Sequence, residues 1–141
     1  MTEEIYKSKT GKKIRLPLYE FPVSAGFPSP ADDYIDKHID LNEYIIKHPA
    51  ATFFVRVKGN SMENSGITDG DLVVVDRALV PADNSIVVAL LDNEFTLKRV
   101  KVRERELFLI PENPSYEPIR ITEDMDFQVW GVVTHCIKEI K

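Results

Sequence analysis

Short apolar segments separated by turn residues fill the chain from residue 51 onward. Six of them are rich in β-branched or aromatic residues and are bounded by Gly, Asp, Asn or Pro, a pattern typical of β-strands. The six segments cover residues 52–58, 71–76, 85–91, 94–101, 106–110 and 127–137. Leu91-Asp-Asn-Glu94 joins the third segment to the fourth and has the composition of a hairpin turn. The pattern predicts a mostly β fold, a small antiparallel β-domain.

One segment has the signature of a short helix. Asp40-Leu-Asn-Glu43 is a D-x-x-E capping box at the start of the segment, and His48-Pro49 ends it. Aspartate at the N-cap accepts a hydrogen bond from an amide of the first turn, whereas the residue before a proline is disfavoured in a helix. The sequence therefore predicts one short helix between these two signals.

The first 30 residues have the composition of an extended arm. Pro17 and Pro22 disfavour a helix across residues 14–22, and residues 23–33 combine small side chains with glycine and prolines. Small side chains let a backbone lie close to a nucleophile, so this stretch also suits a bound peptide substrate. We therefore predict a flexible N-terminal arm at residues 1–30 and a β-rich domain at residues 31–141.

Charge and composition narrow the classes of function. The net charge is −5, and residues 1–15 carry five basic against two acidic residues, which leaves −8 for residues 16–141. An acidic body disfavours direct DNA binding, although the basic arm could contact nucleic acid, contact an acidic partner or remain solvated. No apolar run approaches the roughly 20 residues of a membrane span, and the charged amino terminus lacks a signal-peptide core. One cysteine, Cys136, fits a reducing compartment, so we expect a cytoplasmic protein with no membrane contact.

Ser61 is the first candidate for chemistry. It follows the strand predicted at residues 52–58 in the loop Lys58-Gly-Asn-Ser61, where backbone amides can point outward as an oxyanion hole. Gly-Asn-Ser is also ordinary turn composition, so this motif alone does not identify a nucleophile.

Lys98 is the second candidate. Alternation along the strand puts Thr96, Lys98 and Val100 on one face, but neither face is cleanly apolar, so the pattern alone favours a solvated lysine on an exposed face. A serine hydroxyl needs a base to take its proton. Lysine has a reference pKa of about 10.4, and burial can lower such a pKa by roughly 3–5 units, which makes a usable base.

Other catalytic groups have weaker support. His38 lies in a charged run, His48 lies at a helix end, and His135 and Cys136 are neighbours on a strand and so point to opposite faces. No zinc, P-loop or dinucleotide-binding motif occurs in the sequence. We expect neither a metal nor a cofactor.

Seven stretches in order along the chain resemble the LexA/UmuD family of self-cleaving serine peptidases. They are residues 26–34, 40–43, 59–62, 66–76, 94–99, 109–116 and 130–135. The resemblance implies a small LexA/UmuD-like β fold and a serine–lysine dyad, with Ser61 as nucleophile and Lys98 as general base. It also implies oxyanion donors at the backbone amides of Asn60 and Ser61, and a scissile bond between Ala25 and Gly26.

The family also implies partners and a pathway. A RecA–single-stranded DNA filament promotes self-cleavage in such proteins, and the shortened homodimer joins a UmuC-type subunit of an error-prone translesion polymerase in the SOS mutagenesis response. Cleavage after Ala25 would leave the 116 residues from Gly26 to Lys141.

Some features depart from the family pattern. Ala25–Gly26 is the bond typical of the repressors, whereas UmuD-type proteins usually have Cys–Gly, and Asn60 replaces a frequent acidic residue. Only about 30 residues precede the body, without a helix-turn-helix, which separates the chain from the repressors. Two alternatives remain: a non-catalytic dimeric adaptor with residues 127–137 as its interface, and a LexA-like repressor remnant that binds DNA through its basic arm.

Overall fold

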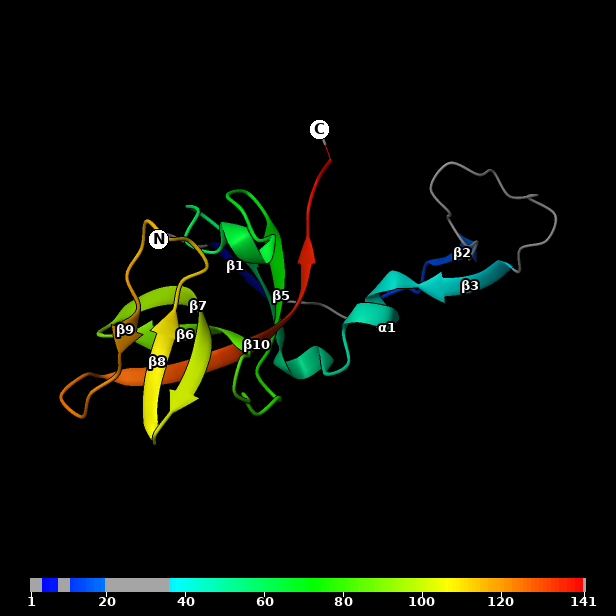
Figure 1. Cartoon of the computed structure of the whole chain (residues 1–141). Coiled ribbons are helices and arrows are strands. Elements are labelled where there is room, and N and C mark those ends of the chain that lie inside the picture. The colour runs from blue at the N-terminus through cyan, green and yellow to red at the C-terminus, as the bar shows by residue number, and fades with distance from the viewer. Residues whose placement is uncertain (1–3, 8–10, 20–35, 141) are drawn as a thin grey trace.

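The computed structural model describes residues 4–7, 11–19 and 36–140, which form mainly β-strands (Figure 1). The strands are β1 (Glu4–Lys7), β2 (Arg15–Tyr19), β3 (Asp36–Asp40), β4 (Thr52–Arg56), β5 (Leu72–Asp76), β6 (Ile86–Leu91), β7 (Glu94–Arg103), β8 (Glu106–Ile110), β9 (Ile119–Arg120) and β10 (Phe127–Ile137). Helix α1 spans Leu41–Ile45, and two 3-10 turns, η2 and η3, span Pro49–Ala51 and Glu63–Ser65. The predicted cleavage bond Ala25–Gly26 lies outside the described residues.

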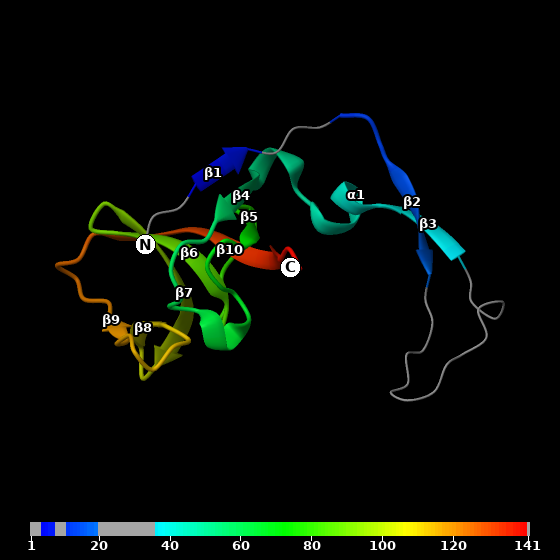
Figure 2. The ribbon, with the colours of Figure 1, turned by 90° about the horizontal axis from the view of Figure 1, so that it is seen from above.

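Eight of the strands form one antiparallel sheet in the order β1-β4-β5-β10-β6-β7-β8-β9. The long strand β10 pairs with β6 through its first half and with β5 through its second half. Strands β2 and β3 form a separate two-stranded sheet, which lies with α1 to one side of the large sheet (Figures 1 and 2). The described residues contain no helix that is long and apolar enough to cross a membrane.

The predicted fold class is confirmed. The six segments expected as strands are β4, β5, β6, β7, β8 and β10, with ends that differ by at most two residues. The predicted hairpin turn has φ values of 48° at Asp92 and 68° at Asn93, the left-handed pair that a tight two-residue hairpin needs. The predicted helix is α1, and its N-cap Asp40 accepts a hydrogen bond from the Glu43 amide at 3.2 Å.

Four strands were not predicted, because each is short or lacks an apolar run. Strand β2 contains Pro17, which cannot donate to a ladder and is tolerated at the edge of its two-stranded sheet. Strand β1 falls within the predicted arm and pairs along β4. The predicted boundary at residue 30 lies outside the described residues and stays a prediction.

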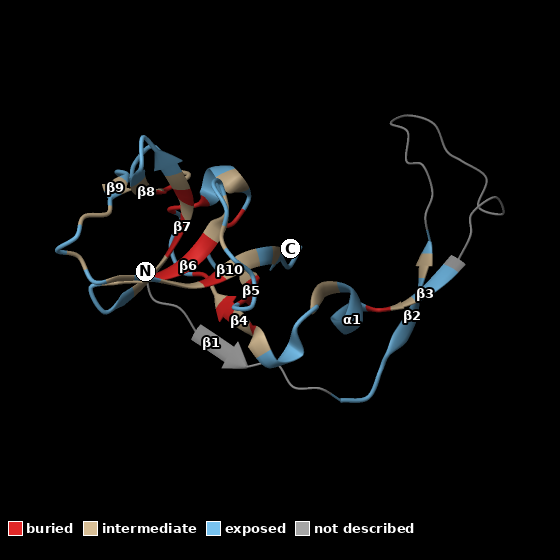
Figure 3. Cartoon of the chain, turned by 90° about the horizontal axis from the view of Figure 1, so that it is seen from below, coloured by how far each residue is buried: buried red, intermediate tan, exposed pale blue. Residues whose placement is uncertain are grey.

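Valine and leucine side chains form two apolar clusters against the large sheet. The first includes Val88 and Leu97, and the second includes Val87, Ala89 and Val100. Because neighbouring residues of β6 and β7 belong to different clusters, both faces of these two strands are covered. Figure 3 shows the buried residues concentrated in this part of the molecule.

Gly131 tests how tightly this core is packed. A Cβ atom at this position would lie 2.5 Å from Cγ1 of Val75, a fully buried and β-branched side chain. We expect Gly131→Ala to reduce the free energy of unfolding by about 1–3 kcal/mol, as overpacked core substitutions do, in urea titrations followed by circular dichroism. Gly11→Ala is the matched control, since a Cβ atom at residue 11 would meet no other atom within 4 Å. Equal stability of the two variants would contradict this packing.

Candidate active site

Ser61 lies in the loop between β4 and η3, and only 3% of its surface is exposed. The chain turns at Gly59, whose φ of +88° lies in the left-handed region that favours glycine. The Val57 amide donates to the Asp71 carbonyl, and the Gly70 amide donates to the Val57 carbonyl, both at 2.8 Å. These backbone bonds fix the chain at the base of the loop.

Lys98 lies in the middle of β7 and is 7% exposed, so the alternative of a solvated lysine is wrong. Its Nζ atom lies 3.4 Å from Ser61 Oγ. Nζ also donates to Thr96 Oγ1 at 2.7 Å and to the Leu97 carbonyl at 3.1 Å. These three oxygens are uncharged, and the fold has largely removed the Lys98 side chain from water.

The segment after β8 holds the Ser61 loop in place. The Ser61 carbonyl accepts from the Glu112 amide, and the Glu112 carbonyl accepts from the Asn64 amide, both at 2.8 Å. The Glu112 carboxylate forms an ion pair with Arg99, which directly follows Lys98 in β7. The separation of Ser61 and Lys98 is therefore set by neighbouring bonds as well as by their own contact.

A cleft of about 280 Å³ opens over this pair. Its lining residues are Lys58, Gly59, Asn60, Ser61, Thr96, Lys98 and Tyr116. Ser61 and Lys98 are the buried members, whereas Lys58 and Tyr116 are exposed. Pockets for drug-sized ligands usually measure about 300–1,000 Å³, so this cleft suits close approach of a short peptide segment better than a large ligand.

The residues predicted as oxyanion donors also line this cleft. Within the described part of the chain, the backbone amides of Asn60 and Ser61 donate no hydrogen bond to another protein group. Thr96 and Tyr116 had no predicted role, although the alternation of β7 did put Thr96 on the face of Lys98.

The histidines lie away from this pair. His48 Nδ1 lies 2.6 Å from Asp76 Oδ2, and His135 Nδ1 lies 2.9 Å from Thr134 Oγ1. Among the described residues, no three His, Cys, Asp or Glu side chains are grouped so that they could hold a metal ion.

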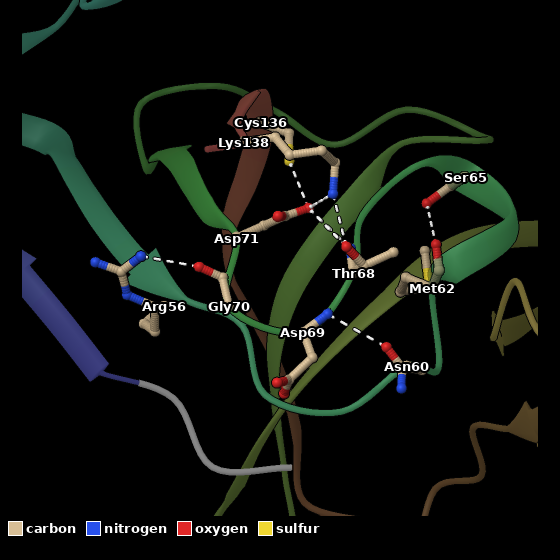
Figure 4. Close-up of polar contacts among 10 residues, drawn as sticks. All are labelled: Arg56, Asn60, Met62, Ser65, Thr68, Asp69, Gly70, Asp71, Cys136 and Lys138. Atoms are coloured by element: carbon tan, nitrogen blue, oxygen red, sulfur yellow. Dashed lines mark hydrogen bonds and ion pairs between the residues drawn. The ribbon is translucent and has the colours of Figure 1, made fainter. Parts of the chain in front are cut away.

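A polar cluster joins the end of β10 to the loop that precedes β5 (Figure 4). Asp71 Oδ2 accepts from Lys138 Nζ at 2.6 Å, from the Thr68 amide at 2.8 Å and from Cys136 Sγ at 3.4 Å. Burial raises the pKa of Asp71, but these hydrogen bonds and the Lys138 charge outweigh it and hold the pKa below its usual value. Burial, followed by the Asp71 carboxylate, raises the pKa of the Cys136 thiol to about 11. The sequence predicted only that Cys136 lies on a strand next to His135.

Comparison with known proteins relates this arrangement to a family. Residues 17–134 match the Peptidase S24-like family model. The chain is 44% identical to Protein MucA of Salmonella typhimurium over 141 residues, covering 99% of this chain and 96% of the relative. It is 47% identical to Protein SamA of the same species over 125 residues, or 89% and 86% of the two chains. It is 39% identical to the LexA repressor of Xylella fastidiosa over 119 residues, or 84% of this chain and 56% of the repressor.

The fold and these matches assign the chain to the class of serine peptidases. The chain belongs to the Peptidase S24-like family. The resemblance to LexA/UmuD-type proteins that the ordered motifs indicated is thereby confirmed.

The polar cluster around Asp71, which we call the Asp71 cluster, predicts that the Cys136 thiol reacts slowly in the folded protein. A pKa raised from 9.0 to about 11 leaves about 100-fold less thiolate at neutral pH, and the greater nucleophilicity of a basic thiolate offsets only part of that loss. We expect iodoacetamide to alkylate Cys136 in the native protein at least about tenfold more slowly than in the urea-unfolded chain. Asp71→Asn removes the carboxylate that raises the pKa and should accelerate alkylation of the folded protein. Equal rates for folded and unfolded chains would contradict this interpretation.

Proposed function

We propose that this protein cuts its own Ala25–Gly26 bond, with Ser61 as nucleophile and Lys98 as general base. The observation that carries this proposal is the 3.4 Å separation of Ser61 Oγ and Lys98 Nζ, two buried polar atoms at the bottom of a cleft. Membership of a peptidase family supports the same reaction class.

The surroundings of Lys98 suit a base. Removal from water disfavours an ammonium ion relative to a neutral amine. The neutral amine has two N–H groups and one lone pair. If the two N–H groups donate to Thr96 Oγ1 and to the Leu97 carbonyl, the lone pair is directed toward Ser61. The 3.4 Å contact is longer than a strong hydrogen bond, and catalytic contacts commonly shorten when substrate binds.

The first half of the proposed reaction forms an ester. The neutral Lys98 amine takes the proton of Ser61 Oγ, which attacks the carbonyl carbon of Ala25. The amides of Asn60 and Ser61 stabilise the resulting oxyanion. The Lys98 ammonium then gives its proton to the nitrogen of Gly26, and the C–N bond breaks. Ala25 remains joined to Ser61 Oγ as an ester.

The second half releases the fragment. Lys98 takes a proton from water, which attacks the ester carbon. The Lys98 ammonium then returns this proton to Ser61 Oγ as the ester C–O bond breaks. The products are the Ala25 carboxylate, the amino group of Gly26 and an unchanged Ser61–Lys98 pair. Small side chains at Ala25 and Gly26 fit the small cleft, because they let the backbone approach Oγ closely.

We further propose that this cleavage acts in SOS mutagenesis. A RecA–single-stranded DNA filament would promote it, and the shortened chain would act as a homodimer with a UmuC-type subunit of a translesion polymerase in the cytoplasm. Similarity to MucA, SamA and ImpA over most of the chain supports a role of this type. The acidic body agrees with contacts to proteins in preference to sequence-specific DNA contacts.

Substitutions at the two proposed catalytic residues test the reaction. With a RecA–single-stranded DNA filament present, Ser61→Ala and Lys98→Ala should each lower the cleavage rate by at least about a thousandfold, because nucleophile and base act as a unit. Lys98→Arg should fail as well, since a guanidinium does not lose its proton at usable pH. The assay measures the fragment of residues 26–141 by intact mass and amino-terminal sequencing.

The matched control is Lys101→Ala, which removes a lysine from the same strand and outside the cleft. It should cut at the wild-type rate. Normal cleavage by Ser61→Ala would overturn the proposed dyad, and absence of cleavage in the wild-type chain would favour the adaptor role.

The pH dependence of unstimulated cleavage tests the identity of the base. Only the neutral amine can accept the Ser61 proton, so the rate should rise with pH and fall about tenfold for each unit below the pKa of Lys98. First-order rates measured between pH 7 and 10 without RecA check this sign. Lys101→Ala should give the same profile as wild type, and a flat profile would exclude lysine as the titrating base.

A further inference from the structure

Asp69 makes a two-way contact with the residues that precede Ser61. Asp69 Oδ1 accepts from the Gly59 amide at 2.7 Å, and the Asp69 amide donates to Asn60 Oδ1 at 3.3 Å. The carboxylate itself is exposed and lies in the loop before β5, beside the Asp71 cluster (Figure 4). We call these two hydrogen bonds the Asp69 clasp.

Asn113 and Glu112 hold the same loop from its carbonyl side. The Asn60 carbonyl accepts from Asn113 Nδ2 at 2.7 Å, and the Ser61 carbonyl accepts from the Glu112 amide at 2.8 Å. In a planar trans peptide the carbonyl of one residue and the amide of the next point in opposite directions. Fixing the Asn60 carbonyl therefore also fixes the direction of the Ser61 amide.

The orientation of the Asn60 amide depends on the preceding peptide. Gly59 adopts a φ of +88°, and its freedom around that turn is large because glycine lacks a side chain. The Asp69 clasp restricts this freedom at two points, the Gly59 amide and the Asn60 side chain. Among the described residues, no other hydrogen bond joins Gly59 or Asn60 to the loop before β5.

We propose that Asp69 is a positioning residue that aligns the Asn60 amide for the oxyanion, beside a Ser61 amide whose direction Asn113 sets. This inference rests on the proposed function. Asp69 touches neither the scissile bond nor Lys98 in this proposal. It acts by holding the groups on either side of the Gly59–Asn60 peptide, the Gly59 amide and the Asn60 side chain, so that the Asn60 amide faces the carbonyl oxygen before the reaction begins. Oxyanion donors contribute most when they are oriented in advance and need no rearrangement in the transition state.

The test compares three variants of the full-length chain in unstimulated cleavage across the alkaline pH range. Asp69→Ala removes the carboxylate acceptor and should lower the maximum rate about tenfold or more, because small displacements of catalytic groups cost this much. The pH midpoint should not move, since Lys98 keeps its surroundings. Asp69→Asn keeps a side-chain oxygen that can accept from the Gly59 amide and should restore most of the rate.

Asp83→Ala is the matched control, because Asp83 is also an exposed carboxylate that accepts from one backbone amide, that of Val102, at 2.9 Å. It should lose a similar amount of thermal stability and keep the wild-type cleavage rate. A wild-type maximum rate in Asp69→Ala would overturn the inference, as would a shifted pH midpoint or an equal loss of rate in Asp83→Ala. Ordinary cleavage by Ser61→Ala would instead reject the proposed function itself, so the two failures are distinguishable.

Discussion

Lys98 occupies a strand that is hydrogen-bonded on both sides, to β6 and to β8, and this placement constrains the rest of the site. The backbone of Lys98 pairs with Val87 of β6, and the β8 ladder begins at the next residue, Arg99, so a loop rearrangement cannot move it without breaking strand pairing. The amine is therefore a fixed point, and Ser61 must be brought to it. The loop after β4, the segment after β8 and the loop before β5 all contribute bonds that do so.

Burying an amine in this way is unfavourable unless polar atoms surround it. The structure supplies a hydroxyl from Thr96, a carbonyl from Leu97 and the hydroxyl of Ser61. Each of these three oxygens is uncharged. Contacts to uncharged oxygens hold the side chain in place with a smaller preference for the charged form of the amine than a contact to a carboxylate would give.

The sequence was sufficient to predict the six main strands and the helix, and insufficient to predict the four short strands or the arrangement of the site. Strong apolar runs indicated the six main strands, and Asp-Asn indicated the first hairpin turn. The second tight turn is formed by Glu104 and Arg105 with φ values of 50° and 67°, and these residue types carry no turn signal. The burial of Lys98 could not be predicted either. Alternation identifies a solvent-exposed face only in a strand that is covered on one side. Here Leu97 and Val100 pack into different clusters, so both faces are covered.

Contacts between distant loops could not be predicted from the sequence, because spacing along a chain does not specify which loops meet. Asn113 and Asp69 have ordinary turn surroundings in the sequence, yet both bond to the residues just before Ser61. The bonds described above that hold Ser61 and Lys98 are made by residues between Val57 and Asn113. Among the described residues, the contacts that set the 3.4 Å separation of Ser61 Oγ and Lys98 Nζ therefore come from segments far apart in the sequence, which only the folded chain brings together.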